Sequence, residues 1–136
     1  MNIDYRFGND LNIDQVIDLY KASTLGLRRP VDDKLRMQQM IREANLVVSA
    51  WAEDRLVGIA RSLSDFCYAT YLADLAVDSA YQKQGIGKEL MRLTRQKGGR
   101  ATVFLFAAPA AVDYYPHMGF REGKGFMLKE EDILKL

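Results

Sequence analysis

The 136-residue sequence contains very few of the residues that hold metals, disulfides or membrane anchors. Its one cysteine, Cys67, excludes an internal disulfide, and its one histidine, His117, excludes a conventional Cys/His metal cluster. No apolar run approaches the ~18 residues that a membrane span needs. The N-terminal residues lack the basic and apolar regions of a signal peptide. We therefore expect a soluble, cytoplasmic protein that holds no metal and inserts in no membrane.

The sequence also lacks an excess of charge of either sign. Nineteen Lys and Arg residues stand against eighteen Asp and Glu residues, which leaves a net charge of +1. A protein that binds nucleic acid by neutralising many phosphates needs more positive charge, so a nucleic-acid partner is not expected. The length and the 49% hydrophobic share suit one folded domain, predicted to span residues 1–136 without a linker or repeat.

Hydrophobic periodicity and turn residues predict the order of the secondary structure. Strand patterns cover residues 3–7, 46–52, 56–62, 68–77, 102–107 and 126–128. Helical spacing is found after Asn12, after Asp32 or Asp33, after the Gly85/Gly87 pair, and over residues 110–117. The order of these elements predicts an α/β (α+β) fold, with a sheet that carries helices on its faces.

Two details of this prediction can be checked against the structure. In the second helix, Leu35, Met40 and Ile41 are expected to face inward. The run of residues 102–107 is so continuously apolar that it predicts a buried strand away from the edge of the sheet.

A glycine-rich segment, Gln82-Lys-Gln-Gly-Ile-Gly-Lys88, lies between a predicted strand and a predicted helix. Its two glycines let the backbone approach a ligand, and the start of the helix adds a positive end, so the turn suits a phosphate. A dinucleotide-binding fingerprint would need glycine at Leu90, and a P-loop would need glycine at Gln82. Both standard nucleotide motifs therefore fail. The remaining alternative to an anion site is a tight turn without a ligand.

The same segment resembles the Q/R-x-x-G-x-G/A signature of the GNAT superfamily of acyl-CoA-dependent N-acyltransferases. A second block, AVDYYPHMGF over residues 111–120, is similar to the A-x-x-x-Y-x-x-x-G-F segment of that family. The resemblance implies a mixed, mostly antiparallel central sheet with helices on both faces. It also implies that the strands before and after the CoA-binding helix splay apart.

The resemblance further implies the reaction and its residues. A GNAT-type N-acetyltransferase moves an acetyl group from acetyl-CoA directly to an amine, carried by a small molecule or a peptide, within a ternary complex and without a metal. Tyr115 matches the family tyrosine that protonates the CoA sulfur, so we expect it to be the general acid. The implied donor-binding residues are Leu75, Ala76, Val77, Gln82, Lys83, Gln84, Gly85, Ile86, Gly87 and Lys88.

The sequence leaves undecided which group takes the proton from the acceptor amine. Asp74 lies on the strand that would face the acyl group, so it is the first candidate for a general base. Asp65, at the end of the preceding strand, is the second, and water is the third. For each carboxylate, a solvated acid in a loop or at a strand edge is an equally good explanation.

The sequence also leaves the identity of the acceptor undecided. The family resemblance implies that it lies against the loop of residues 23–33 and the strands near the acyl group. In this loop, Arg28 and Arg29 would suit an acceptor that carries a carboxylate. The acids Asp32, Asp33, Asp65 and Asp74 would instead suit a cationic amine. For the two arginines, a solvated loop is the favoured interpretation.

A second functional class is compatible with the same motifs. A protein that kept the acyl-CoA site but lost turnover would act as a sensor or interaction module. Tyr115 favours the enzyme, whereas Ala108, which stands where the family often has asparagine, favours the sensor. A homodimer is a further expectation that the sequence leaves open.

Overall fold

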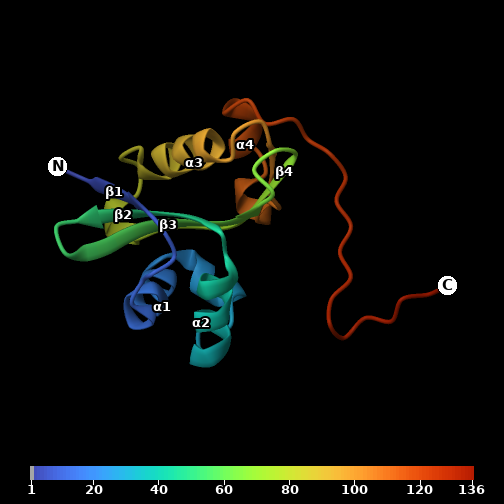
Figure 1. Cartoon of the computed structure of the whole chain (residues 1–136), viewed down its shortest axis with the longest axis horizontal. Helices are drawn as coiled ribbons and strands as arrows, with labels where there is room; N and C mark the ends of the chain where they lie inside the picture. Colours follow the sequence, from blue (N-terminus) through green and yellow to red (C-terminus); the bar gives the residue numbers. More distant parts are fainter. Residues whose placement is uncertain (1) are drawn as a thin grey trace. The chain divides into compact units, whose positions relative to one another are not determined.

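The computed structural model describes residues 2–136, and its first 105 residues are built around one five-stranded sheet. The strands are β1 (Asp4–Phe7), β2 (Leu46–Ala52), β3 (Arg55–Ser64), β4 (Ala69–Val77) and β5 (Thr102–Phe104). They lie in the order β1-β2-β3-β4-β5 (Figure 1). Neighbours from β1 to β4 pair antiparallel, whereas β5 pairs parallel to β4. The mixed, mostly antiparallel sheet expected from the sequence is confirmed.

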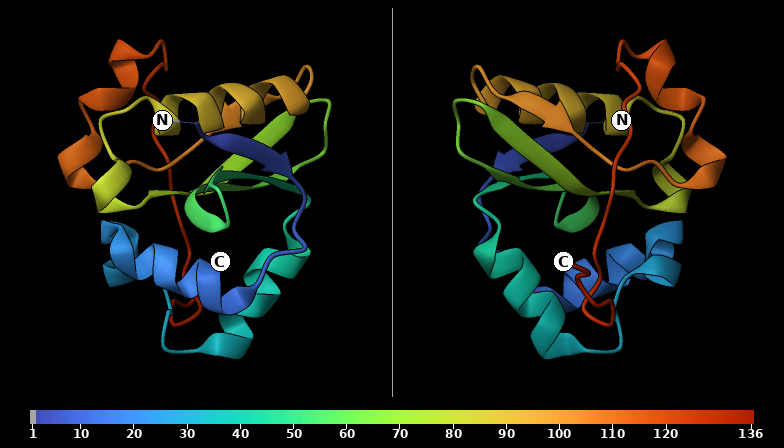
Figure 2. Two further views of the ribbon diagram at one scale, coloured as in Figure 1. Left: turned by 90° about the vertical axis from the view of Figure 1, so that its left-hand side faces the viewer. Right: turned by 90° about the vertical axis from the view of Figure 1, so that its right-hand side faces the viewer.

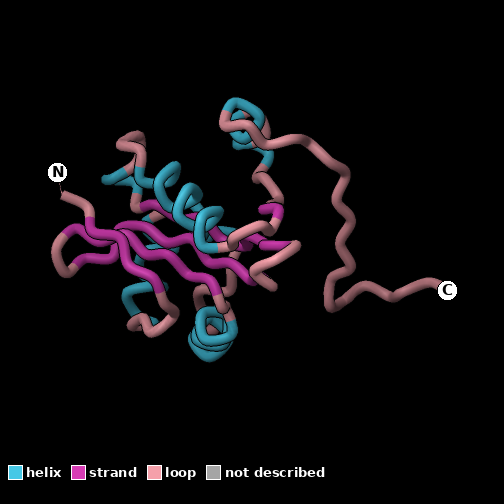
Figure 3. The backbone as a smooth tube through the Cα atoms, turned by 45° about the horizontal axis from the view of Figure 1, so that its top comes forward, coloured by secondary structure: helices cyan, strands magenta, loops and turns pink. Residues whose placement is uncertain are grey.

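Helices cover both faces of this sheet. The helices of the first 105 residues are α1 (Ile13–Ala22), η1 (Thr24–Arg28), α2 (Lys34–Glu43), η2 (Ser79–Tyr81) and α3 (Ile86–Lys97). In Figures 2 and 3, α1 and α2 lie on one face of the sheet and α3 lies on the opposite face. The η2–α3 segment is the crossover that returns the chain from β4 to the parallel strand β5.

Side-chain caps begin the first two long helices, as the sequence predicts. Asn12 accepts a hydrogen bond from the amide of Gln15 at 3.1 Å, and Asp33 accepts one from the amide of Arg36, also at 3.1 Å. Each cap satisfies an amide that the first turn of a helix would otherwise leave without a partner. Asp33, rather than Asp32, therefore fixes the start of α2.

The main core lies between the sheet and the α1/α2 layer. It is formed by Val16, Ile17, Leu19, Tyr20, Leu25, Met37, Ile41, Ala44, Val47, Trp51, Leu56, Ile59 and Ala76. In α2 the buried residues are Met37 and Ile41, spaced four apart, and Met40 packs beside them. The inward position predicted for Leu35 is wrong, because its side chain is 80% exposed. Since α2 begins at Lys34, Leu35 lies in the first turn and off the buried stripe.

The opposite face of the sheet receives α3 at very close range. A Cβ atom on Gly58 of β3 would lie 3.1 Å from Ile86 Cγ2 and 3.1 Å from Leu90 Cδ1. Only glycine lets the helix approach the strand this closely. Ile86 and Leu90 are both buried there.

Two strand predictions from the sequence are wrong. The run of residues 102–107 forms only the three-residue strand β5, which lies at the edge of the sheet. Phe104 and Phe106 are about half exposed rather than buried. Residues 126–128 form no strand, and Phe126 is 91% exposed. An apolar run alone cannot reveal which neighbours a strand will have, because the order of strands is decided by the whole sheet.

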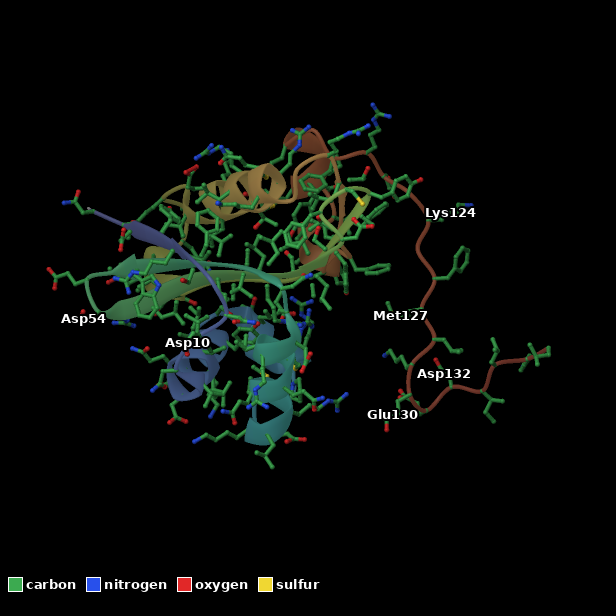
Figure 4. All side chains as sticks on the ribbon, in the orientation of Figure 1. Asp10, Asp54, Lys124, Met127, Glu130 and Asp132 are labelled. Carbon is green, nitrogen blue, oxygen red and sulfur yellow. The ribbon has the colours of Figure 1, made fainter. Side chains whose placement is uncertain are left out.

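The chain divides into two compact units, Met1–Leu105 and Phe106–Leu136. The second unit contains η3 (Pro109–Ala111) and α4 (Tyr114–His117), which together replace the single short helix predicted over residues 110–117. After Phe120 the chain continues without helix or strand. Lys124, Met127, Glu130 and Asp132 are spread along this extended segment (Figure 4). The single domain expected over residues 1–136 stays a prediction.

Replacement of Met37 by alanine tests the described core. Met37 is fully buried, so truncation should lower the free energy of unfolding by about 2–5 kcal/mol. Leu35→Ala, in the same helix, is the matched control and should change it by less than about 0.5 kcal/mol. Urea unfolding followed by circular dichroism measures both. Equal losses would mean that α2 presents a different face to the sheet.

Candidate functional site

A β-bulge in β4 determines which way the side chains of this strand point. Arg61 of β3 pairs with Asp74, but the next residue, Ser62, pairs with Leu72, so Ala73 has no partner opposite it. Before the bulge, Thr70 lies under the end of α3, where its hydroxyl would be 2.8 Å from a Cβ on Gly98. After it, Asp74 faces α1 on the other side of the sheet. The extra residue thus aims Asp74 at the α1 face.

The bulge coincides with the point at which β4 and β5 separate. The parallel ladder has three pairs and ends at Tyr71 and Phe104, whereas β4 continues to Val77. From residue 72 onward, β4 is therefore paired with β3 alone among the described residues. The splayed strands expected from the family resemblance are confirmed. The free edge of residues 72–77 can hydrogen-bond an extended ligand in the manner of an added strand.

The glycine turn leaves the start of α3 without a cap. Lys83 and Gly85 adopt positive φ angles of 64° and 85°, and Gly85, in the N-cap position, offers no side-chain bond. Within residues 2–136, no acceptor bonds the amides of Ile86, Gly87 or Lys88. Three amides and the positive end of a twelve-residue helix therefore face the same region.

The space over this helix end is open to a ligand. A Cβ on Gly87 would meet only Val77 Cγ2, at 3.8 Å, and a Cβ on Gly85 would meet nothing within 4 Å. Gln82 donates from its side-chain amide to the carbonyl of Val77 at 2.9 Å, which ties the turn to the end of β4. The donor set of free amides suits a phosphate anion, so the residues present fit the pyrophosphate of CoA.

Asp74 is the most strongly bonded carboxylate of the candidate site. Its side chain is fully buried. The hydroxyl of Tyr20 donates to Oδ2 at 2.6 Å, the Nε of Arg29 donates to Oδ1 at 2.6 Å, and the Nε of Arg61 donates to Oδ2 at 2.5 Å. These four side chains, which we call the Asp74 cluster, come from α1, β3, β4 and the residue that follows η1.

The protonation states of the Asp74 cluster follow from these contacts. Burial would raise the pKa of Asp74, but the hydrogen bonds and charges of Arg61, Tyr20 and Arg29 outweigh it and hold that pKa below its ordinary value. Burial and the negative charge of Asp74 raise the pKa of Tyr20 well above its ordinary value. Asp74 is therefore an anion and Tyr20 a protonated donor. A carboxylate with a low pKa and three bonded donors is poorly suited to take a proton as a general base.

Asp65 has a different structural role from the one expected of a base. Its Oδ1 accepts hydrogen bonds from the amides of Cys67, Tyr68 and Ala69 at 2.8 to 3.0 Å. These bonds hold the pKa of Asp65 far below its ordinary value. The side chain thus closes the turn between β3 and β4.

Arg29 is not the solvated loop residue that was favoured from the sequence. Its Nη2 donates to the carbonyl of Ala73 at 2.9 Å, in addition to its bond with Asp74, and its side chain is 25% exposed. Arg28, by contrast, is exposed. Sequence reasoning also missed Tyr20 and Arg61. The available signal was Arg61, a charged residue that directly follows the apolar run of residues 56–60.

The second unit holds Tyr115, the expected general acid. Its ring forms edge-to-face contacts with Tyr114, at a centroid distance of 5.3 Å, and with Phe120, at 5.5 Å. Its carbonyl accepts hydrogen bonds from the amides of Met118 and Phe120 at 3.0 and 3.2 Å. The YYPHMGF block is thus a compact turn that orients the Tyr115 ring. His117, in the same turn, is exposed.

The comparisons with known proteins agree on one family. A family model described as an acetyltransferase (GNAT) domain matches residues 23–131. An uncharacterized N-acetyltransferase ycf52-like protein of Prochlorococcus marinus is 35% identical over 107 residues, covering 72% of this chain and 57% of the relative. The chain thus spans only about half the length of this relative. It belongs to the GNAT acetyltransferase family.

Solved structures show the same fold. The GNAT family acetyltransferase SP0256 of Streptococcus pneumoniae superposes with a TM-score of 0.79 at 24% identity, covering 96% of this chain and all of that one. The aminoglycoside N-acetyltransferase AAC(6')-Iy in complex with CoA superposes with a TM-score of 0.72 at 18% identity, covering 96% of this chain and 95% of that one.

Neither a cluster of metal-binding side chains nor a membrane-spanning helix is found within residues 2–136. No group of three or more His, Cys, Asp or Glu side chains in this range is arranged to hold a metal ion. No helix in the same range is long and apolar enough to cross a membrane.

Replacement of Asp74 by asparagine tests the Asp74 cluster. The loss of the charge leaves two arginines without their shared partner and should lower the free energy of unfolding by about 3–5 kcal/mol at pH 7. Because the folded-state pKa is lowered, the stability contributed by the carboxylate is present above its unfolded pKa of about 3.9 and is lost as the pH falls through the folded value.

The difference in stability between wild type and Asp74→Asn should therefore narrow below about pH 4. Chemical unfolding of both proteins, measured from pH 7 to pH 2, gives this difference at each pH. Asp32→Asn is the control. Asp32 is an exposed acid in the loop of residues 23–33, so this change should alter the free energy of unfolding little at any pH. A difference that stayed constant down to pH 2 would show that the charge of Asp74 is not what stabilises the fold.

Proposed function

We propose that this protein is an N-acetyltransferase that moves an acetyl group from acetyl-CoA directly to an amine within a ternary complex. The observation that carries the proposal is the uncapped start of α3, where the amides of Ile86, Gly87 and Lys88 have no acceptor in the described chain. Membership of the GNAT family supports it. A neighbour of the same fold, AAC(6')-Iy, was solved in complex with CoA.

The donor would be held by backbone groups along the free edge of β4 and at the start of α3. The amides of residues 83–88 would bind the pyrophosphate, with Lys83 and Lys88 adding positive charge. Leu75, Ala76 and Val77 would pair with the pantetheine arm along the edge that β5 leaves free. Gln82 would act indirectly, because its side chain fixes the carbonyl of Val77.

We assign the acid role to the Tyr115 hydroxyl, which would give its proton to the sulfur of the departing CoA. The support is the match of residues 111–120 to the family block and the packing of the Tyr115 ring between Tyr114 and Phe120. Positioned proton transfer contributes about 10²–10⁴-fold to the rate.

We assign no side chain to the base role. Asp74 and Asp65, the two carboxylates that the sequence suggested, are both bonded internally and have lowered pKa values. The proton of the acceptor amine would therefore leave to water. In this proposal Asp74 is a positioning residue that holds the loop after η1 against β4 through Arg29.

A CoA-binding sensor with little or no turnover is the alternative. Ala108, in the position where the family often has asparagine, favours it, because an alanine side chain offers no hydrogen bond to the pantetheine arm. Release of free thiol from acetyl-CoA across a panel of amines separates the two. The cytoplasmic location and the homodimer stay predictions.

Replacement of Gly87 by glutamate tests the donor site. Acetyl-CoA at about one hundred times its dissociation constant should add ~2.7 kcal/mol to wild-type stability and raise the melting temperature by several degrees. Gly87→Glu should abolish this shift, because the new side chain brings bulk and negative charge to the free amides. Thermal unfolding with acetyl-CoA, CoA and ATP in parallel measures it.

Gly87→Ala is the matched control for this experiment. Its Cβ would lie at an ordinary distance of 3.8 Å from Val77 Cγ2, so the fold and most of the binding should be kept. Stabilisation of the wild type by ATP but not by acetyl-CoA would overturn the proposed donor. An undiminished shift in Gly87→Glu would place the donor elsewhere.

Replacement of Tyr115 by phenylalanine tests the acid. The change removes one hydroxyl and keeps both ring contacts, so kcat should fall by about 10²–10⁴-fold while the affinity for acetyl-CoA stays nearly constant. Tyr114→Phe, at the neighbouring tyrosine, is the control and should keep kcat within about a factor of three of wild type. Steady-state thiol release and calorimetric titration measure the two quantities. An unaltered rate in Tyr115→Phe would remove this residue from the acid role.

A further inference from the structure

The Asp74 cluster carries more positive than negative charge. Arg29 and Arg61 each contribute one positive charge, Asp74 contributes one negative charge, and Tyr20 stays neutral. The sum is +1 in a region where the carboxylate is fully buried and Arg61 is 12% exposed. Charge that is partly removed from water interacts more strongly with a ligand than charge at an open surface. The donor site proposed above makes no use of this excess.

The two guanidinium groups also have hydrogen-bond donors to spare. A guanidinium carries five N–H groups. Arg29 uses three of them, toward Asp74, Ala73 and the carbonyl of Arg28. Arg61 uses its Nε and one Nη, toward Asp74 and the carbonyl of Met40.

The Nη2 of Arg61 bonds to no acceptor in residues 2–136. Among these residues, the hydroxyl of Ser62 is the completely buried side-chain atom without a partner, so the Nη2 of Arg61 is not completely buried. Arg29, with a quarter of its side chain exposed, is likewise accessible. An anion that reached these groups would gain charge-assisted hydrogen bonds.

The position of the cluster suits the acceptor rather than the donor. The bulge at Ala73 turns Asp74 toward α1, on the face of the sheet opposite α3. The uncapped end of α3 serves the donor from the other face. Arg29 binds the carbonyl of Ala73, beside the residues at which β4 leaves β5. An amine that approached the free edge of β4 from the α1 face would pass the two arginines.

The acids that could have favoured a cationic acceptor are mostly occupied. Asp74 is paired with the arginines, Asp65 closes a turn, and Asp33 caps α2. Asp32 remains as an exposed carboxylate in the loop. Three of the four acids thus have hydrogen bonds within the protein, whereas Arg29 and Arg61 keep N–H groups beyond their bonds to the cluster.

We propose that the acceptor amine carries a carboxylate, and that Arg29 and Arg61 bind this carboxylate. The inference rests on the proposed function and deepens it, because it names the chemical class of the acceptor. In this arrangement the Asp74 carboxylate orients both guanidinium groups, and their remaining N–H groups bind the substrate. Arg29 and Arg61 are therefore specificity-determining residues, whereas Asp74 and Tyr20 are positioning residues.

The wild-type protein tests the inference through matched pairs of acceptors. One pair is 4-aminobutanoate and 4-aminobutanamide, in which three methylenes separate the amine from the group that differs. A second pair is L-alanine and L-alaninamide, and spermidine represents a purely cationic acceptor. Thiol release from acetyl-CoA gives kcat/KM for each. We expect the carboxylate of at least one pair to be preferred about tenfold or more over its amide.

Variants show whether the two arginines cause this preference. Arg29→Ala and the milder Arg61→Lys should lower the carboxylate-to-amide ratio of kcat/KM toward one. A merely structural defect would lower both values together and leave the ratio unchanged, so the ratio separates recognition from folding. Arg28→Ala is the matched control, because the exposed side chain of Arg28 takes part in no described bond of the cluster. It should keep the wild-type ratio.

The possible outcomes distinguish the inference from the proposed function. Turnover of amides or spermidine as fast as carboxylates would overturn the carboxylate class and leave the acetyltransferase intact. A carboxylate preference that survived in both arginine variants would overturn the assignment of Arg29 and Arg61. Binding of acetyl-CoA without thiol release to any amine would overturn the enzyme itself. If Arg29→Ala does not fold, the wild-type ratio and Arg61→Lys still decide the question.

Discussion

The buried carboxylate of Asp74 holds together three parts of the chain that are distant in sequence. It accepts hydrogen bonds from Tyr20 of α1, from Arg29 after η1, and from Arg61 of β3. A carboxylate removed from water costs several kcal/mol unless partners compensate it, so these contacts are required together. They fix the loop after η1 against β4, whose edge is unpaired with β5 from residue 72 onward.

The bulge at Ala73 shifts the alternation of side chains along β4. Thr70 and Asp74 would share one face in an unbroken strand, but Thr70 packs toward α3 and Asp74 faces α1. The same point marks the end of the pairing between β4 and β5. The free backbone edge and the orientation of Asp74 thus arise from one interruption of regular pairing. In the proposed function, the donor uses this edge and the uncapped end of α3, and the acceptor uses the Asp74 cluster.

Features decided within a few residues could be predicted from the sequence. Asn12 and Asp33 cap their helices because a short polar side chain reaches an amide three residues on. The turn at Gly85 could be predicted because glycine readily adopts the positive φ that this turn requires. Leu35 and β5 were predicted wrongly, because the exposure of a side chain depends on which helix face and which strand neighbour the whole sheet supplies.

The sequence by itself determined the family, since the turn of residues 82–88 and the block of residues 111–120 are local patterns of glycine and aromatic residues. It also determined the mixed fold, through the order of strands and helices. Only the tertiary structure decided the roles of the charged residues. Asp74 was the first of three candidates for the base, and Arg29 was favoured as a solvated residue. In the structure the Nε of Arg29 lies 2.6 Å from Oδ1 of Asp74, although 45 residues separate them in sequence. Charge, burial and pKa depend on such distant neighbours, and no local pattern encodes them.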